Sequence, residues 1–455
     1  MTLLPAKLAA ARAAGAVSRR AGRGGTSLPG KLLLRLEPGA VGSLAARLRN
    51  GSAVISATNG KTTTAAMVAS ILERGGRLLV HNRAGANMAG GIAGTLLEAA
   101  GPRGAIAGDT GLFEIDEFWL DRLVPQIRPR ALLLANLFRD QLDRYGELET
   151  IADRWAGVVA QARETTLVLN ADDPLVADLG REHEGVVYFG VEDPAVALAG
   201  LAHAADSKHC RRCGAPYRYD YVFLGHLGHY HCDACGATRP APSVAAERVI
   251  LDGLRGARVT LRLPEATVDV RLPLPGLYNV YNALGAAALT TALGASPADV
   301  VAGLEAVSAA FGRAETVALE GRSLLLLLVK NPAGANEVLR TLALEDGEHD
   351  VFAVLNDHTA DGRDVSWVWD ADFETLAGRL RRVTCSGTRA AEMALRLKYA
   401  GVPEDRLLVE PSLAAGLDRA VSDGTGRLVA IPTYTAMLEL RRELVARGAA
   451  GSSFA

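Results

Sequence analysis

Short apolar runs alternate with amphipathic segments from residue 52 to about residue 200, and the same alternation returns after about residue 315. In the first block the strand-like runs are AVISA (53–57), ALLLAN (131–136) and TLVLN (166–170). In the second block they are LLLLLVKN (324–331), VFAVLND (351–357), RRVTCSG (381–387) and RLVAIPT (427–433). The pattern predicts two α/β blocks, each a parallel sheet covered by helices, with ligands at the carboxyl ends of the strands.

The segment between the blocks has other patterns of hydrophobic and polar residues. Residues 258–276 alternate like a β-hairpin, and residues 277–295 predict a helix that ends near Gly294. The basic, alanine-rich N-terminus predicts a helix and a loop, because arginines interrupt each apolar run before a signal peptide could form. The longest uncharged apolar run further on, residues 324–329, is far shorter than the ~20 residues that span a bilayer.

The length of 455 residues predicts two or three domains at the usual ~100–200 residues each. We expect an N-terminal segment at 1–50, a central α/β domain at 51–312 and a C-terminal domain at 313–455, with the boundary near Phe311-Gly312-Arg313. Hydrophobic residues make up 49% and the formal net charge is -2, which argues against disorder and against a general polyanion-binding surface.

Four of the five cysteines form two closely spaced pairs, Cys210-x2-Cys213 and Cys232-x2-Cys235. This spacing predicts a structural tetrahedral zinc site in a small inserted ribbon at 205–240. We expect the histidines of this insertion to lie on the surface: His209, His226, His229 and His231. Its basic residues, Lys208, Arg211 and Arg212, leave open a zinc-ribbon nucleic-acid-binding ATPase.

The segment SAVISATNGKTTTAAMVAS (52–70) predicts a strand, a turn and a helix in that order. This order directs backbone N–H groups and a helix N-terminus at one point, where a phosphate would be stabilised. The expected ATP-binding residues are Thr58, Asn59, Gly60, Lys61, Thr62 and Thr63. Lys61 would neutralise phosphate oxygens and Thr62 would hold Mg²⁺, although Ile55 replaces the first glycine of the usual phosphate-binding loop.

With that replacement, ATNGKTT resembles the ATP loop of the Mur ligase superfamily, whose members activate a carboxylate as an acyl phosphate and pass it to an amine. Further segments resemble the family's motifs in the same order: FEIDE (113–117), ANLFRDQLDRYGELE (135–149), NADDP (170–174), PGLYNVYNALGAA (275–287), FGRAE (311–315) and VKNPAG (329–334). The chain departs from the family at Gln141 and Lys330, where histidines are usual.

The resemblance implies roles for several of these residues. Glu114 and Glu117 are the candidates for binding Mg²⁺, and Arg313 would contact ATP or the acyl phosphate when the domains close, unless it forms a structural salt bridge. Asn279 and Asn282 would read adenine or a phosphate, or simply cap a helix.

The segment LNDHTADGRDVSWVWDADFE (355–374), with the zinc insertion and PTYTAML (432–438), resembles the MurT family, the Mur-ligase-like subunits of lipid II isoglutaminyl synthases. This implies that the usual UDP-binding N-terminal Mur domain is absent. It also implies ATP-dependent amidation of the α-carboxyl of D-glutamate in the lipid II stem peptide. Ammonia would come from a GatD-like class I glutamine amidotransferase in a heterodimer.

The same resemblance implies that an aspartate of this chain completes the partner's catalytic triad, with Asp357 the first candidate and Asp361 the second. Trp367 and Trp369 would pack in the core or at that interface, and Cys385 is expected to be a buried cysteine at a strand end. The implied place of action is the cytoplasm, with peripheral contact at the inner face of the plasma membrane. An amino-acid ligase of the Mur or folylpolyglutamate type is the alternative enzyme.

Overall fold

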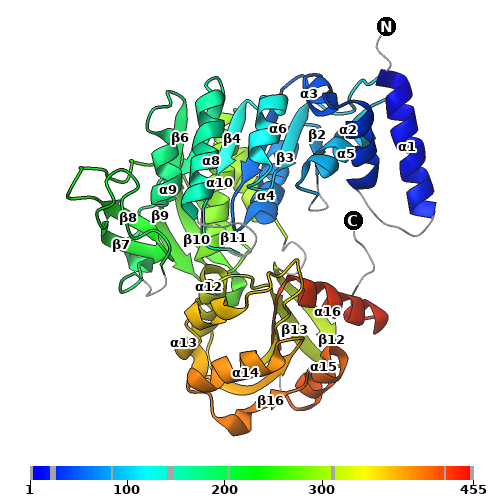
Figure 1. Ribbon diagram of the computed structural model, residues 1–455. Helices are drawn as coiled ribbons and strands as arrows, with labels where there is room; N and C mark the ends of the chain where they lie inside the picture. Colours follow the sequence, from blue (N-terminus) through cyan, green and yellow to red (C-terminus); the bar gives the residue numbers. More distant parts are fainter. Residues whose placement is uncertain are drawn as a thin grey trace.

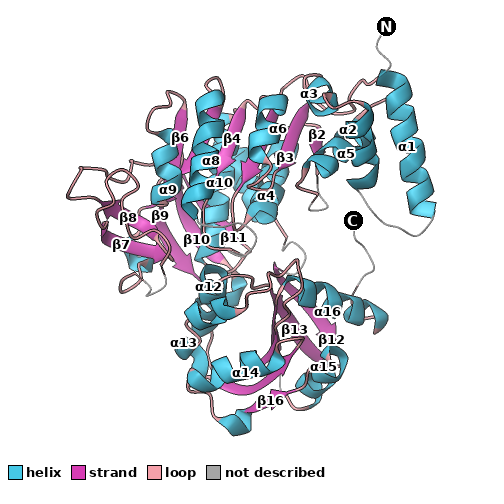
Figure 2. Cartoon of the chain, in the orientation of Figure 1, coloured by secondary structure: helices cyan, strands magenta, loops and turns pink. Residues whose placement is uncertain are grey.

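The computed structural model describes residues 4–20, 27–82, 86–140, 148–201, 205–308, 313–424 and 427–450. Two helix-covered sheets lie one above the other, the central block above the C-terminal block (Figure 1). Helices pack on the faces of both sheets, and a small two-stranded ribbon stands beside the larger sheet (Figure 2). The predicted α/β class is therefore confirmed.

The central sheet has nine strands in the order β11-β10-β9-β6-β5-β4-β1-β3-β2. Their bounds are β1 Ser52–Ser56, β2 Leu79–His81, β3 Thr110–Glu114, β4 Ala131–Leu134, β5 Thr166–Asn170, β6 Val186–Val191, β9 Val244–Leu251, β10 Ala257–Arg262 and β11 Thr267–Leu272. The strands from β2 to β9 are parallel, and β10 and β11 form the predicted antiparallel hairpin. Because β3, β1 and β4 are neighbours, the polar residues that follow them meet at one edge of the sheet.

Helices cover both faces of this sheet, so its middle strands β3, β1 and β4 are buried along their whole length. The helices of this block are α1 Leu4–Arg20, α2 Ser27–Leu36, α3 Ala40–Ala45, α4 Lys61–Arg74, α5 Ala89–Ala99, α6 Leu120–Ile127, α8 Leu148–Gln161, α9 Pro174–Ala177, α10 Leu277–Ala292 and α11 Pro297–Glu305, of which α1 lies at the outer edge, packed on α2 (Figure 1). Successive strand residues enter opposite cores: Leu133 packs on the side of α4 and α10, whereas Leu132 and Leu134 pack on the side of α6 and α8. The predicted N-terminal helix and the helix ending near Gly294 are confirmed.

The C-terminal sheet has six strands in the order β12-β13-β17-β14-β15-β16, parallel except for β12. Its strands are β12 Arg313–Leu319, β13 Arg322–Leu327, β14 His349–Val354, β15 Leu380–Ser386, β16 Leu407–Val409 and β17 Arg427–Pro432. Its helices are α12 Pro332–Ala343, α13 Glu374–Ala377, α14 Ala390–Tyr399, α15 Leu413–Ser422 and α16 Tyr434–Ala446. The four predicted strands are confirmed. Trp367 packs partly buried against this core, whereas Trp369 is 48% exposed and lies edge-on to Tyr399.

The expected domain boundary falls on residues 311 and 312, which lie outside the described residues, and β12 begins at Arg313. The side chain of Arg313 and residue Gln141 also lie outside the described part of the chain. Among the described helices, none is long and apolar enough to cross a membrane.

Candidate active site

The loop after β1 has the geometry of a phosphate-binding turn. β1 ends at Ser56 and α4 begins at Lys61, so Ala57 to Gly60 form the connection. Gly60 adopts a left-handed conformation with φ of 84°, which turns the chain directly into the helix. The N-terminus of α4 therefore begins at the loop, as the sequence predicted.

Asn136, which follows β4, clamps this loop from one side. Its Oδ1 accepts a hydrogen bond from the backbone N–H of Asn59 at 2.9 Å, and its Nδ2 donates to the carbonyl of Asn59 at 3.0 Å. The hydroxyl of Thr58 accepts from the backbone N–H of Phe138 at 3.1 Å. No role of Asn136 was predicted from the sequence, although the motif 135–149 contains it. Thr58 is 3% exposed and holds the loop to this segment.

Asn279 and Asn282 brace the loop from α10. Asn282 donates to Oδ1 of Asn279 at 3.1 Å, and the Oδ1 of Asn282 accepts from the hydroxyl of Thr64 at 3.3 Å. Both asparagines are buried, and Gly60 packs directly against Asn282. Both lie inside α10, whose N-cap is Gly276, and Nδ2 of Asn279 donates to the carbonyl of Pro275 at 2.7 Å. The structure therefore favours a role for these amides in fixing the loop over simple helix capping.

We expect Gly60→Ala to weaken ATP binding by at least about tenfold, because the new Cβ would collide with Oδ1 of Asn282 and also strain the positive φ. A fluorescence titration with an ATP analogue measures this. Gly76→Ala is the matched control, since Gly76 has φ of 78° but nothing within 4 Å of an added Cβ. Both variants should lose roughly 1–2 kcal/mol of stability from the backbone strain. Equal ATP affinities would contradict the steric argument.

Lys61 lies among buried carboxylates that come from the end of β3. Its Nζ lies 2.7 Å from Oε2 of Glu117 and also donates to the carbonyl of Ala57. Burial alone would lower the pKa of Lys61, but the charges of Glu117, Glu114 and Asp116 outweigh it, so the pKa is raised and the amine stays charged. Burial, reinforced by Glu117, raises the pKa of Asp116.

Two of the predicted magnesium ligands, Glu114 and Glu117, face Lys61. Glu114 is 3% exposed and Glu117 is 6% exposed, while Thr62 is half-buried in the first turn of α4. Carboxylate and hydroxyl oxygens are the ligands that Mg²⁺ prefers. The chemistry of these side chains therefore suits a divalent cation, and Lys61 compensates the charge of the two carboxylates in the structure.

The C-terminal block reaches the loop through the residues that follow β13. Lys330 donates to the carbonyl of Thr58 at 3.1 Å and pairs with the buried carboxylate of Asp140. Asn331 and Asn59 exchange amide hydrogen bonds at 3.0 and 3.3 Å. Lys330, which stands where the resemblance predicts a histidine, therefore contacts the backbone of the loop after β1 through its ammonium group.

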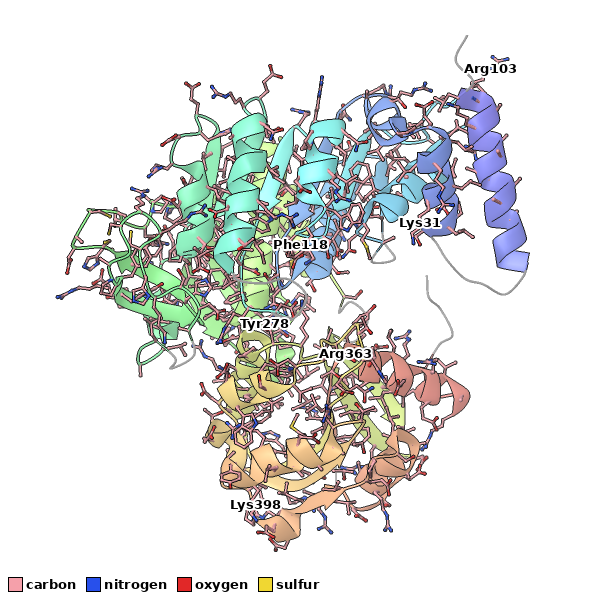
Figure 3. All side chains as sticks on the ribbon, in the orientation of Figure 1. Lys31, Arg103, Phe118, Tyr278, Arg363 and Lys398 are labelled. Carbon is pink, nitrogen blue, oxygen red and sulfur yellow. The ribbon has the colours of Figure 1, made fainter. Side chains whose placement is uncertain are left out.

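Glu337 on α12 is buried and is hydrogen-bonded to the backbone of Tyr278 at the start of α10. Tyr278 lies where the two blocks meet (Figure 3). Burial raises the pKa of Glu337 from 4.5 to about 7 against the opposing charge of Arg340.

The folded chain therefore holds a proton on Glu337 that the unfolded chain releases above about pH 4.5. We expect stability to fall as the pH rises from about 4.5 to above about 7, and Glu337→Gln to remove this part of the slope. Urea unfolding midpoints across that range test it, with the exposed Glu404→Gln as control.

The two candidate triad aspartates differ sharply in their surroundings. Asp357 follows β14 with a side chain 25% exposed, and it accepts hydrogen bonds of 2.8 Å from the hydroxyl of Thr388 and from Nε of Arg389. The hydrogen bond from Thr388, followed by that from Arg389, lowers the pKa of Asp357. Asp361 is 5% exposed and its carboxylate is held by the N–H and hydroxyl of Thr435. Only Asp357 is placed to meet a partner without unpacking the chain.

Cys385 is fully buried in β15, and burial raises the pKa of its thiol to about 12. This confirms the prediction of a buried cysteine. A neutral, inaccessible thiol is a poor nucleophile.

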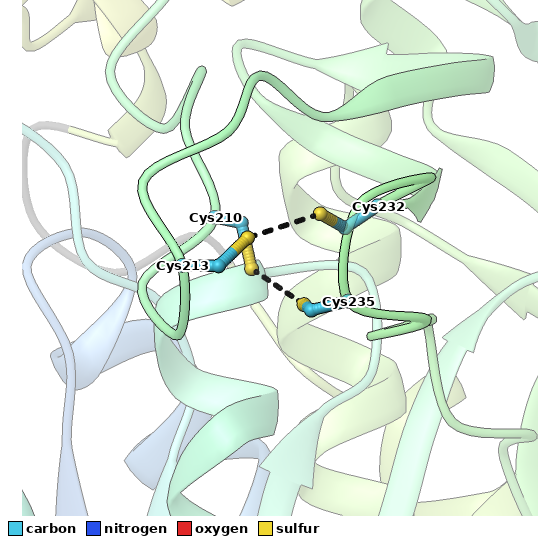
Figure 4. A group of neighbouring side chains, drawn as sticks. All are labelled: Cys210, Cys213, Cys232 and Cys235. Atoms are coloured by element: carbon cyan, nitrogen blue, oxygen red, sulfur yellow. Dashed lines mark hydrogen bonds between the residues drawn. The ribbon is translucent and has the colours of Figure 1, made fainter.

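The four remaining cysteines meet as predicted. One ligand atom from each of Cys210, Cys213, Cys232 and Cys235 lies within 4.8 Å of the others (Figure 4). Each pair forms the same turn: Gly214 donates to the carbonyl of Cys210 at 2.7 Å, and Gly236 donates to that of Cys232 at 2.9 Å. Four soft sulfur ligands in two matching turns fit a structural Zn²⁺ with no open position.

The prediction that all histidines of the insertion lie on the surface is wrong for His226. Its side chain is fully buried against Phe138, with 4.9 Å between ring centroids, and its Nε2 lies 3.4 Å from Oδ1 of Asp173. The cause is the turn between β7 (Arg218–Leu224) and β8 (Leu227–His231), which inserts into the central core. The basic residues Arg211 and Arg212 pair with Asp153 and Asp178, so they present no open cationic face.

Comparison with known proteins agrees with this arrangement. The family described as "Mur ligase middle domain" matches residues 55–214, and the family described as "MurT ligase C-terminal" matches residues 328–437. The MurT subunit of lipid II isoglutaminyl synthase (glutamine-hydrolyzing) from Staphylococcus aureus strain N315 is 33% identical over 95% of this chain and 96% of its own length. The chain belongs to the MurT family. A MurT subunit from Streptococcus pneumoniae strain R6 is also 33% identical, over 97% of this chain and 96% of its own length.

Solved structures show the same fold beyond the MurT family. A pseudomurein peptide ligase type C from Methanothermus fervidus aligns with a TM-score of 0.66 at 23% identity, covering 88% of this chain and 79% of that one. MurF from Acinetobacter baumannii aligns with a TM-score of 0.66 at 19% identity, covering 93% and 80%. At these identities the likeness establishes the Mur ligase fold alone.

Proposed function

We propose that the chain is the ATP-using subunit of a lipid II isoglutaminyl synthase. It would convert the α-carboxyl of D-glutamate in the lipid II stem peptide to the amide of D-isoglutamine. The observation that carries the proposal is the likeness to MurT subunits along nearly the whole chain, from the ATP loop to the segment of Asp357. The proposed domains remain 1–50, 51–312 with the ribbon at 205–240, and 313–455.

In the proposed reaction, ATP phosphorylates the substrate carboxylate, because a free carboxylate is a poor electrophile and an acyl phosphate carries a leaving group. The backbone of residues 58–62 and the ammonium of Lys61 would hold the phosphates, and Arg313 would contact them from the C-terminal domain. When bound, Mg²⁺ would neutralise charge on the transferring phosphoryl group, held by Thr62, Glu114 and Glu117. Lys61 already touches Glu117, so phosphate and carboxylates would share one cationic centre.

The nitrogen donor would be ammonia released by a GatD-like glutaminase subunit in a heterodimer. A glutaminase needs a cysteine nucleophile and a histidine base oriented by a third group. Cys385 is buried and protonated, so the nucleophile would reside on the partner. Asp357 would be the orienting carboxylate, because it is ionised, partly exposed and held in one orientation by Thr388 and Arg389. The reaction would take place in the cytoplasm, at the inner face of the plasma membrane where lipid II is presented.

The decisive experiment is an amidation assay of lipid II with the purified chain, ATP and either glutamine plus a glutaminase subunit or an ammonium salt. Mass spectrometry of the stem peptide should show that an amide has replaced the α-carboxyl of D-glutamate. Incorporation of an amino acid in place of an amide nitrogen would support the amino-acid ligase alternative. Tight binding of DNA or RNA with a steep salt dependence would support the nucleic-acid alternative, which the pairing of Arg211 and Arg212 disfavours.

A further inference from the structure

The zinc-stapled hairpin has two different ends. The knuckles that carry the four cysteines lie at one end, and the turn of the hairpin lies at the other, where Phe223, Leu224 and Leu227 belong to the central core. Gly225 in the turn packs so closely on Phe138 that a Cβ would come within 2.9 Å of its ring. The hairpin is therefore wedged into the nucleotide-binding domain.

The turn supports the segment that clamps the ATP loop. His226 packs on Phe138 and faces Asp173, and the other oxygen of Asp173 accepts a hydrogen bond from the backbone N–H of Leu137 at 2.9 Å. Arg139 in the same segment pairs with Asp206 at the root of the insertion. Asn136, the residue before Leu137, holds Asn59 through its side-chain amide.

The same hairpin also holds the C-terminal domain. Arg340 on α12 donates to the carbonyl of Phe223 in β7 at 2.9 Å and to the carbonyl of Val196 at 2.6 Å. In Figure 1, α12 lies directly between the two blocks. The residue before α12 is Asn331, which caps the helix and exchanges hydrogen bonds with Asn59.

Two series of contacts therefore connect the hairpin to the same residue of the ATP loop. One runs through His226 and Asn136 to Asn59, and the other runs through Arg340 and Asn331 to Asn59. We propose that the zinc ribbon is a positioning element, which aligns the C-terminal domain with the ATP loop through the positioning residues Arg340 and His226. The proposal rests on the proposed use of residues 58–62 to bind ATP. In this proposal, zinc fixes the hairpin, and the hairpin fixes Asn136 and Asn331, the two residues that hold Asn59.

The test combines Arg340→Gln with Glu337→Gln, because removing the guanidinium alone would leave the carboxylate of Glu337 buried without its compensating charge. Glu337→Gln alone is the matched control. Relative to that control, we expect the double variant to bind ATP about five- to tenfold more weakly, a loss of about 1–1.4 kcal/mol. Amide hydrogen exchange should accelerate in α12 and in residues 58–60, whereas zinc content should stay at one ion per chain. Arg340→Lys with Glu337→Gln should recover part of the protection.

Removing zinc from the full-length chain with a chelator should accelerate exchange in the same segments. In the double variant, zinc removal should change α12 little further, because the link to the hairpin is already cut. Two results would show that the ribbon is only a local staple. One is that zinc removal causes the same loss of exchange protection in α12 of the wild-type chain and of the double variant. The other is that the double variant matches Glu337→Gln in ATP affinity and in hydrogen exchange. If the zinc-free chain unfolds as a whole, the zinc-loaded double variant decides the question by itself. Neither measurement uses lipid II, so a wild-type chain that binds ATP but makes no amide would overturn the proposed function and leave this inference standing.

Discussion

Lys61→Ala is expected to abolish amide synthesis with glutamine and with ammonium salts alike. The ammonium of Lys61 is the cation that faces Glu117 and Glu114 at the ATP loop, and its removal would leave transferring phosphate oxygens without a compensating charge. Losing one preorganised group of this kind costs roughly 10²- to 10³-fold in rate. Both nitrogen sources depend on the same acyl phosphate, so the loss should be equal, as measured by amide formed on lipid II.

Two controls separate this chemical loss from a loss of folding. Lys398→Ala removes a lysine at the far end of the C-terminal domain and should leave synthesis unchanged (Figure 3). Lys61→Ala also strips the buried Glu117 of its partner, which typically costs several kcal/mol of stability. Adding Glu117→Gln should restore part of that stability and none of the synthesis. Full activity in either Lys61 variant would remove this loop from the proposed mechanism.

The strands that carry the site could be predicted because they are buried on both faces. β1, β4, β5 and β14 each contain a run of three or more apolar residues in the sequence, since helices cover both sides of each sheet. The edge strands β2 and β16 have three residues each and are only half-buried, so neither was predicted. The phosphate-binding loop could be predicted for a related reason, because its strand, turn and helix are contiguous in the chain.

The contacts between distant segments could not be predicted from one sequence. Asn59 is held by Asn136 from the segment after β4 and by Asn331 from the C-terminal domain, and no local pattern marks either pairing. His226 sits in a polar, cysteine-rich stretch, so a surface position was the natural expectation. It is buried because Phe138 and Asp173 come from another part of the chain to cover it. Asp357 and Asp361 also differ in burial, whereas the sequence of the segment NDHTADG does not distinguish these two aspartates.

Asp357→Asn should lose glutamine-dependent synthesis and keep most of the ammonium-dependent synthesis. Asparagine keeps the size of the side chain but cannot hold a partner's histidine in the charged, oriented state that a triad needs, a loss on the order of 10⁴-fold in a comparable triad. The local cost is small, because the pair with Arg389 lies at the surface, where such pairs contribute about 0–1 kcal/mol. The ATP half of the reaction does not use this residue.

Two neighbouring aspartates make this prediction specific. Asp364→Asn changes an exposed carboxylate in the same segment and should leave both activities intact. Asp361→Asn should lower both activities together with stability, because the carboxylate of Asp361 is buried and ties the segment to Thr435 at the start of α16. The ratio of glutamine-dependent to ammonium-dependent rates is therefore the informative quantity. It should collapse only in Asp357→Asn, and an unchanged ratio there would mean that the partner's triad takes its carboxylate from somewhere other than this strand end.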